Sequence, residues 1–178
     1  MELTHILDVA EQQFFWKEYQ EVKLDTIARE LGIKKPSLYY YFKTKREFFL
    51  KTLDYSTKKY LGKMREVIAT WDLFDFLHRY LAFPSKEHNL FAIASQQWYG
   101  DDREITYLVN HARTLIDKET EQFLTTFTTN EVKIYLVMEL LDKLAMDNCT
   151  DWYCLDYSLT DLSEEIEEMI RGCKVVND

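Results

Sequence analysis

The stretch Leu24–Glu47, LDTIARELGIKKPSLYYYFKTKRE, decides the fold of this chain. Apolar residues recur at i, i+3, i+4 and i+7 from Leu24 and form one face of a helix. Gly32 ends that helix, because glycine accepts the left-handed conformation that a helix end often requires. A second short helix begins near Lys35 with a proline in its first turn, where a missing N–H costs nothing. The stretch therefore predicts a helix-turn-helix.

The second helix has one anchored face and one free face. At about 100° per residue, Leu38 and Phe42 lie together and are expected to hold the helix to its own domain. The opposite side carries serine and tyrosine hydroxyls, which can hydrogen-bond phosphate oxygens and base edges. From Leu31 to Arg46 there are five basic residues and no acid. Phosphate binding needs this kind of local positive charge.

The segment IARELGIKKPSLYYYFKTKREFF resembles the DNA-binding signature of TetR-family transcriptional repressors. The resemblance covers about the first third of the chain and implies a repressor that binds a palindromic operator in double-stranded DNA. A helix-turn-helix that serves only as a packing unit is the alternative. The residues that carry the resemblance are Ile27, Ala28, Gly32, Ile33, Leu38, Tyr39, Tyr40, Tyr41, Phe42 and Lys45. The candidate DNA-contacting residues are Lys23, Lys34, Lys35, Pro36, Ser37, Tyr39, Tyr40, Tyr41, Thr44 and Lys45.

Lysines stand where relatives of the family place helix caps. Lys23 and Lys34 replace a Ser or Thr, and lysine cannot accept a hydrogen bond from a helix N–H. At both positions the helix lacks a side-chain cap, and the lysine ammonium group could instead reach a phosphate. Thr44 and Glu47 form a capping box that opens the next helix. Lys45 in its first turn could hold a phosphate together with the free N–H groups, or could simply be solvated.

Composition predicts an all-α protein. The chain has 178 residues, of which 47% are hydrophobic, with only two prolines and four glycines. We expect about nine helices, with a three-helix DNA-binding domain in residues 1–47 and a helical effector-binding and dimerisation domain in residues 48–178. The first helix is expected at residues 3–19, before the helix-turn-helix. The helices after it are expected from residue 45 to about Ile68, from Asp72 to Pro84, from Ser85 to Gly100, from Asp101 to Phe123, from Asn130 to Asp147, and from about Thr160 onward.

The charge distribution is uneven. The net charge is −9, yet residues 1–50 carry eight acids and eight bases, so the negative charge lies in the remainder. That remainder should avoid DNA. No apolar run approaches the roughly 18 residues that would span a bilayer. The N-terminus has acids and no basic leader. We expect a prokaryotic cytoplasmic protein, associated with the nucleoid when bound to DNA, with no membrane partner.

The resemblance also implies what the second domain does. The helix that Asn130 caps is apolar on two faces, so it and the last helix resemble the pair that forms a four-helix bundle in TetR homodimers. Closure of the monomer core is the alternative. The family habit of binding a small inducer suggests an apolar or aromatic ligand. Candidate pocket residues, which could equally be ordinary core, are Trp71, Phe74, Trp98, Tyr99, Tyr107, His111, Met138 and Trp152.

Other functions receive little support. There is no Gly-rich phosphate loop, nucleophile elbow or H-E-x-x-H motif, so we expect no enzyme activity and no cofactor. Cys149 and Cys154 lie at the edge of zinc-ligand spacing, but no second pair or nearby histidine completes a metal site, and packing cysteines are the simpler interpretation. A helical regulator or protein-interaction module that acts without a small inducer is the remaining alternative.

Overall fold

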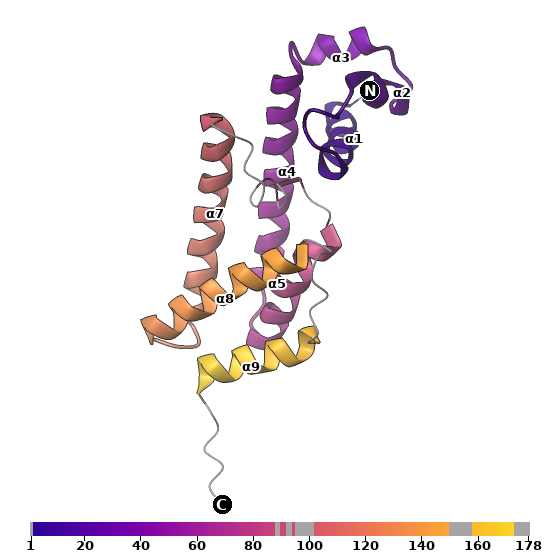
Figure 1. Cartoon of the computed structure of the whole chain (residues 1–178). Coiled ribbons are helices and arrows are strands. Elements are labelled where there is room, and N and C mark those ends of the chain that lie inside the picture. The colour runs from indigo at the N-terminus through magenta and orange to yellow at the C-terminus, as the bar shows by residue number, and fades with distance from the viewer. Residues whose placement is uncertain (1, 88–89, 92–93, 95–101, 150–157, 173–178) are drawn as a thin grey trace, which may run out of the picture. The chain divides into compact units, whose positions relative to one another are not determined.

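The computed structural model describes residues 2–87, 90–91, 94, 102–149 and 158–172. Within these ranges the chain forms eight α-helices and no strand, which confirms the all-α prediction (Figure 1). The helices are α1 (Leu3–Trp16), α2 (Leu24–Glu30), α3 (Lys35–Tyr41), α4 (Lys45–Ile68), α5 (Leu73–Glu87), α7 (Arg103–Leu124), α8 (Glu131–Cys149) and α9 (Leu159–Arg171). None of the described helices is long and apolar enough to cross a membrane.

The chain divides into two compact units. One contains Met1–Tyr60 and His88–Asn110, and the other contains Leu61–Glu87 and His111–Asp178. Helices α4 and α7 each contribute their first part to the first unit and their last part to the second. The domain boundary expected after residue 47 stays a prediction.

Aromatic packing builds the core of the first unit. Phe14 of α1 is 1% exposed, and its ring lies 5.0 Å from the ring of Phe49 and 6.1 Å from that of Phe48. Ile27 of α2 and Leu38 of α3 are also buried. The three N-terminal helices are thus held on the first turns of α4 by the apolar faces that the sequence predicted.

Helix α5 is the centre of the second unit and packs against both α8 and α9 (Figure 1). Leu73, Phe76 and Leu77 are fully buried on it. Val137 and Leu141 of α8 are buried as well. The opposite face of α8 remains open, as its two-faced pattern predicts.

Two expected helix ends were wrong. The first helix ends at Trp16 rather than residue 19, because Lys17 adopts extended backbone and the next residues form a turn with Glu21 N–H donating to the carbonyl of Glu18 at 2.9 Å. Helix α5 continues through Pro84 to Glu87, so Ser85 lies inside it and begins no new helix. Proline lacks one backbone donor, but the buried face before it commits the segment to helix.

Two further predicted starts agree with the structure. Asn130 Oδ1 accepts the Lys133 N–H at 3.1 Å and caps α8. Ser158 Oγ accepts the Asp161 N–H at 3.0 Å, which starts α9 one residue before Thr160.

Candidate nucleic-acid interface

The turn between α2 and α3 has the predicted geometry. Gly32 has φ +65°, in the left-handed region that favours glycine. The Ile33 N–H donates to the Ala28 carbonyl at 2.9 Å, and the Gly32 N–H donates to that of Arg29 at 3.1 Å. These bonds satisfy carbonyls at the end of α2 and fix the direction in which α3 leaves.

Helix α3 presents tyrosines outward from a buried anchor. Leu38 is 1% exposed and Phe42 3%, and the Phe42 ring stacks on Phe48 with centroids 4.2 Å apart. On the other side Tyr40 is 86% exposed and Tyr39 45%. Pro36 and Ser37 are exposed too, and Tyr41 is half-buried beside Tyr40. The anchoring of Leu38 and Phe42 and the exposure of Tyr40 are therefore as predicted, whereas Tyr41, expected on the free face, is half-buried and Tyr39, expected beside the anchored residues, is exposed.

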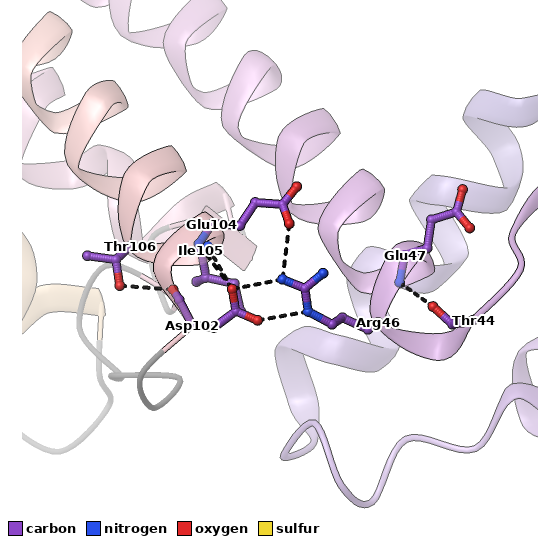
Figure 2. A network of polar contacts seen from close by, with 7 residues as sticks. All are labelled: Thr44, Arg46, Glu47, Asp102, Glu104, Ile105 and Thr106. Atoms are coloured by element: carbon purple, nitrogen blue, oxygen red, sulfur yellow. Dashed lines mark hydrogen bonds and ion pairs between the residues drawn. The ribbon is translucent and has the colours of Figure 1, made fainter.

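The first turn of α4 follows α3 directly and carries the predicted capping box. Thr44 Oγ1 accepts the Glu47 N–H at 3.0 Å (Figure 2). The Glu47 carboxylate accepts the backbone N–H of Lys43 at 2.8 Å, one residue before the cap itself. This bond and the Lys51 ammonium lower the pKa of Glu47. The box fixes where α4 starts relative to α3.

Helices α2 and α3 begin without side-chain caps. Their N-cap residues are Lys23 and Lys34, and neither side chain bonds a helix N–H. Both lysines are exposed. The structure thus confirms that these two positions give up a cap, and Lys34 directly precedes α3.

Two of the lysines near α3 bind protein groups. Lys35 donates to Asp25 Oδ2 at 2.7 Å. The Lys45 ammonium donates to the carbonyls of Tyr19 and Gln20 and lies 4.5 Å from the centre of the Tyr19 ring. Burial there lowers the pKa of Lys45. Lys45 is therefore neither a freely solvated residue nor, in this structure, an open phosphate ligand, and its DNA contact stays a prediction.

Arg46 forms an ion-pair network that the sequence did not predict. Its Nε and Nη2 donate to the two oxygens of Asp102 at 2.9 Å each, and Nη2 also donates to Glu104 Oε2 at 3.0 Å (Figure 2). The guanidinium holds the pKa of Asp102 below its usual range. The partners are 56 and 58 residues away, so no local pattern could have revealed them.

The ligand pocket expected from the sequence stays a prediction. Trp71 is 96% exposed and Tyr107 is 67% exposed. Residues that line an enclosed cavity are more buried than this, so the exposure of these two does not support a pocket role. His111 is exposed, and Phe74 is half-buried with its ring near His78. Trp98, Tyr99 and Trp152 lie outside the described residues, as do Cys154 and the side chain of Cys149.

Met138 does line a groove, between α7 and α8 in the second unit. The groove has a volume of about 530 Å³. Its lining is Asp117, Glu121, Thr125, Glu131, Ile134, Tyr135, Met138, Glu139 and Asp142. Burial and the neighbouring Asp142 raise the pKa of Asp117. Among the residues that the structure describes, no group of three or more His, Cys, Asp or Glu side chains has the arrangement of a metal site.

The geometry of α2, α3 and the start of α4 defines a helix-turn-helix DNA-binding protein. Residues 6–52 match the family described as bacterial regulatory proteins of the tetR family. This match covers the helix-turn-helix segment, where the sequence resemblance also lies. A search of curated protein sequences gave no match.

Solved structures share the fold over nearly the whole chain. The transcriptional regulator FadR from Bacillus subtilis, in complex with stearoyl-CoA, has a TM-score of 0.69 at 17% identity and covers 96% of this chain and 98% of its own. A TetR-like regulator from a Rhodococcus species has a TM-score of 0.68 at 18% identity, with coverages of 94% and 92%. The ketosteroid transcriptional regulator KstR2 of Mycobacterium tuberculosis has a TM-score of 0.65 at 15% identity, with coverages of 95% and 92%. At these identities the likeness concerns the fold alone.

Proposed function

We propose that this protein is a repressor that binds a palindromic operator as a homodimer and leaves it when a small ligand binds. One observation carries the proposal: α3 holds Leu38 and Phe42 in the core while Tyr39 and Tyr40 face outward. A packing-only helix-turn-helix would have no reason to expose two neighbouring aromatic side chains on its second helix. Phenol hydroxyls on a helix of this kind suit base edges and phosphates in the major groove.

The exposed apolar side of α8 supports a dimer. Val132 is 67% exposed and Leu136 50% on that helix, and Met169 of α9 is 44% exposed. Two such helices from each protomer would bury these side chains in a four-helix bundle. A dimer would place two α3 helices on one duplex, at about 34–36 Å or somewhat more, and so read a two-fold symmetric site.

The effector belongs to the helices after residue 48. We propose an apolar or aromatic molecule. Support comes from two proteins of the same fold, one solved with stearoyl-CoA and one described as a ketosteroid regulator. Stearoyl-CoA and a steroid are therefore the first probes to try. If neither these nor other apolar compounds release DNA, a regulator that acts without a small inducer becomes the better proposal.

DNA binding is tested with a fluorescent duplex from the region upstream of the protein's own gene. Fluorescence anisotropy should show binding in the nanomolar to micromolar range at about 50 mM salt, with affinity falling steeply as salt rises. A scrambled duplex should bind much more weakly. Failure of the wild-type protein to bind any such duplex at low salt would overturn the proposed function.

Tyr40→Ala tests the exposed face of α3. Loss of the phenol should reduce discrimination between operator and scrambled duplex by about 1–3 kcal/mol, the usual range for one base-reading side chain. Trp71→Ala is the matched control, because Trp71 is also a highly exposed aromatic residue but lies outside the expected DNA-binding domain. Equal discrimination by wild type and Tyr40→Ala would remove Tyr40 from the interface.

A further inference from the structure

The link between Arg46 and α7 has the geometry of a fixed junction rather than a casual surface pair. The guanidinium binds Asp102 with two parallel bonds of 2.9 Å and adds a third bond to Glu104. Two-pronged Arg–carboxylate pairs are more directional and stronger than single contacts. The Asp102 side chain is only 22% exposed, against 51% for Arg46. These features distinguish the junction from the exposed pair of Lys58 and Asp54 on α4.

Asp102 is also ordered by hydrogen bonds that do not involve Arg46. Its Oδ1 accepts the Glu104 N–H at 3.1 Å and the Ile105 N–H at 3.4 Å, so the carboxylate caps α7. Its carbonyl accepts the Thr106 hydroxyl at 3.1 Å (Figure 2). A carboxylate that is already ordered by a cap loses little further entropy when it binds a guanidinium. Arg46 therefore connects the first turn of α4 to the first turn of α7.

The first turn of α4 is held on a second side as well. Lys45, the neighbour of Arg46, binds the carbonyls of Tyr19 and Gln20 in the turn after α1. The same turn of α4 follows α3 after Phe42 and two further residues. A shift of the start of α7 would thus act on the start of α4, and through it on α3 within the same unit.

The charge balance argues against a phosphate role for Arg46. One guanidinium faces two carboxylates, so the junction has a net charge of −1 at the edge of the basic stretch. Lys43, three residues earlier, is exposed and lies two residues after the end of α3. Of these two cations, Lys43 has the position suited to a phosphate.

We infer that Arg46 is a positioning residue for DNA binding: with Asp102 and Glu104 it ties the first turn of α4, and through it α3, to the start of α7 and does not itself contact DNA. The inference rests on the proposed DNA-binding function. It names the residues through which a change in α7 would reach the DNA-binding domain.

The salt dependence of DNA binding separates positioning from phosphate contact. Arg46→Gln should leave the slope of log affinity against log salt at the wild-type value, while Lys43→Gln should reduce it by about one. A slope reduced by about one in Arg46→Gln would show a phosphate contact and overturn the inference. Absence of wild-type binding is a different result, because it overturns the proposed function itself.

Hydrogen exchange measures the link directly. In the wild type, operator binding should change the exchange rates of the amides at residues 104–110. Arg46→Lys keeps the charge but loses the two-pronged geometry, and Asp102→Asn keeps a capping side chain but loses the charge. Both variants should bind DNA yet lose that response by at least half, whereas Lys58→Gln should keep it. A full response in Arg46→Lys and Asp102→Asn, or no response in the wild type, would overturn the inference.

Discussion

Lys45 and Arg46 are adjacent in sequence, but their cationic groups bind different parts of the protein. The Lys45 ammonium binds backbone carbonyls in the turn after α1, and the Arg46 guanidinium binds carboxylates at the start of α7. A count of charges along the sequence treats both as available to DNA. The structure leaves the exposed Lys23, Lys34 and Lys43 as better candidates.

Glu11 is a buried acid whose loss should be costly. It is 2% exposed, accepts the Ser56 hydroxyl at 2.5 Å and pairs with Lys59 at 2.8 Å. Glu11→Ala removes one partner from each of these groups, while Lys59 keeps Asp8 at 3.1 Å, so the free energy of unfolding should fall by about 1–3 kcal/mol. Urea denaturation of wild type and Glu11→Ala measures this difference in the free energy of unfolding. Asp54→Ala, which removes an exposed pair with Lys58, should cost about 1 kcal/mol or less; a similar small cost for Glu11→Ala would contradict the prediction.

Asp102 should contribute to the stability of the protein against acid. Its pKa is lower in the folded protein than the value of about 3.9 expected for an unfolded chain, chiefly because Arg46 donates to it. Its contribution is therefore complete above that unfolded pKa and is lost as the pH falls through the folded pKa. Asp102→Asn should lose less stability than wild type between about pH 5 and pH 3. Urea denaturation across this range tests it, with Asp54→Asn as control; parallel losses in wild type and Asp102→Asn would refute it.

At the scale of helices, local sequence patterns predicted starts better than ends. Thr44, Asn130 and the turn at Gly32 are specified by side chains that bond the neighbouring backbone, so they can be recognised from the sequence. Pro84 is a local stop signal, yet α5 continues beyond it, because burial against α8 and α9 outweighs one lost hydrogen bond. Tertiary packing of that kind is invisible in a local pattern.

Replacement by alanine should change the free energy of unfolding in opposite directions at Gly32 and at Gly62. An added Cβ would meet no atom within 4 Å at either Gly32 or Gly62, so space does not distinguish them. Gly62 lies inside α4, where alanine should raise the free energy of unfolding by about 0.5–1 kcal/mol. Gly32 has φ +65°, where alanine should lower it by about 1 kcal/mol or more. Urea denaturation of both variants measures these changes. If the free energy of unfolding changed in the same direction in both, the prediction would be contradicted.

At the scale of the whole molecule, the dimer can be tested at one residue. Leu136→Glu places charge on the exposed apolar side of α8, where a partner helix would have to desolvate it. The variant should be a monomer by sedimentation velocity and should lose most of its operator affinity, because one recognition helix alone contacts few base pairs. Tyr107→Glu on α7 is the control. A dimeric Leu136→Glu variant that binds DNA normally would move the interface elsewhere.

The fold class and the exposed side of α3 could be predicted from the sequence, while the long-range contacts could not. Helical periodicity, two prolines in the chain and the anchored pair Leu38 and Phe42 are local information. The partners of Arg46 come from a segment more than fifty residues later. The pocket residues were chosen by type alone, and exposed aromatic residues such as Trp71 show that residue type does not determine position.

The two tasks of Asp102 restrict what can replace it. Asparagine and serine cap a helix but carry no charge for Arg46, while glutamate carries the charge but is a poorer cap. Only aspartate meets both demands with one short carboxylate. Although surface positions ordinarily accept most substitutions, we expect a saturation library at position 102 to yield aspartate almost alone wherever full regulation is selected.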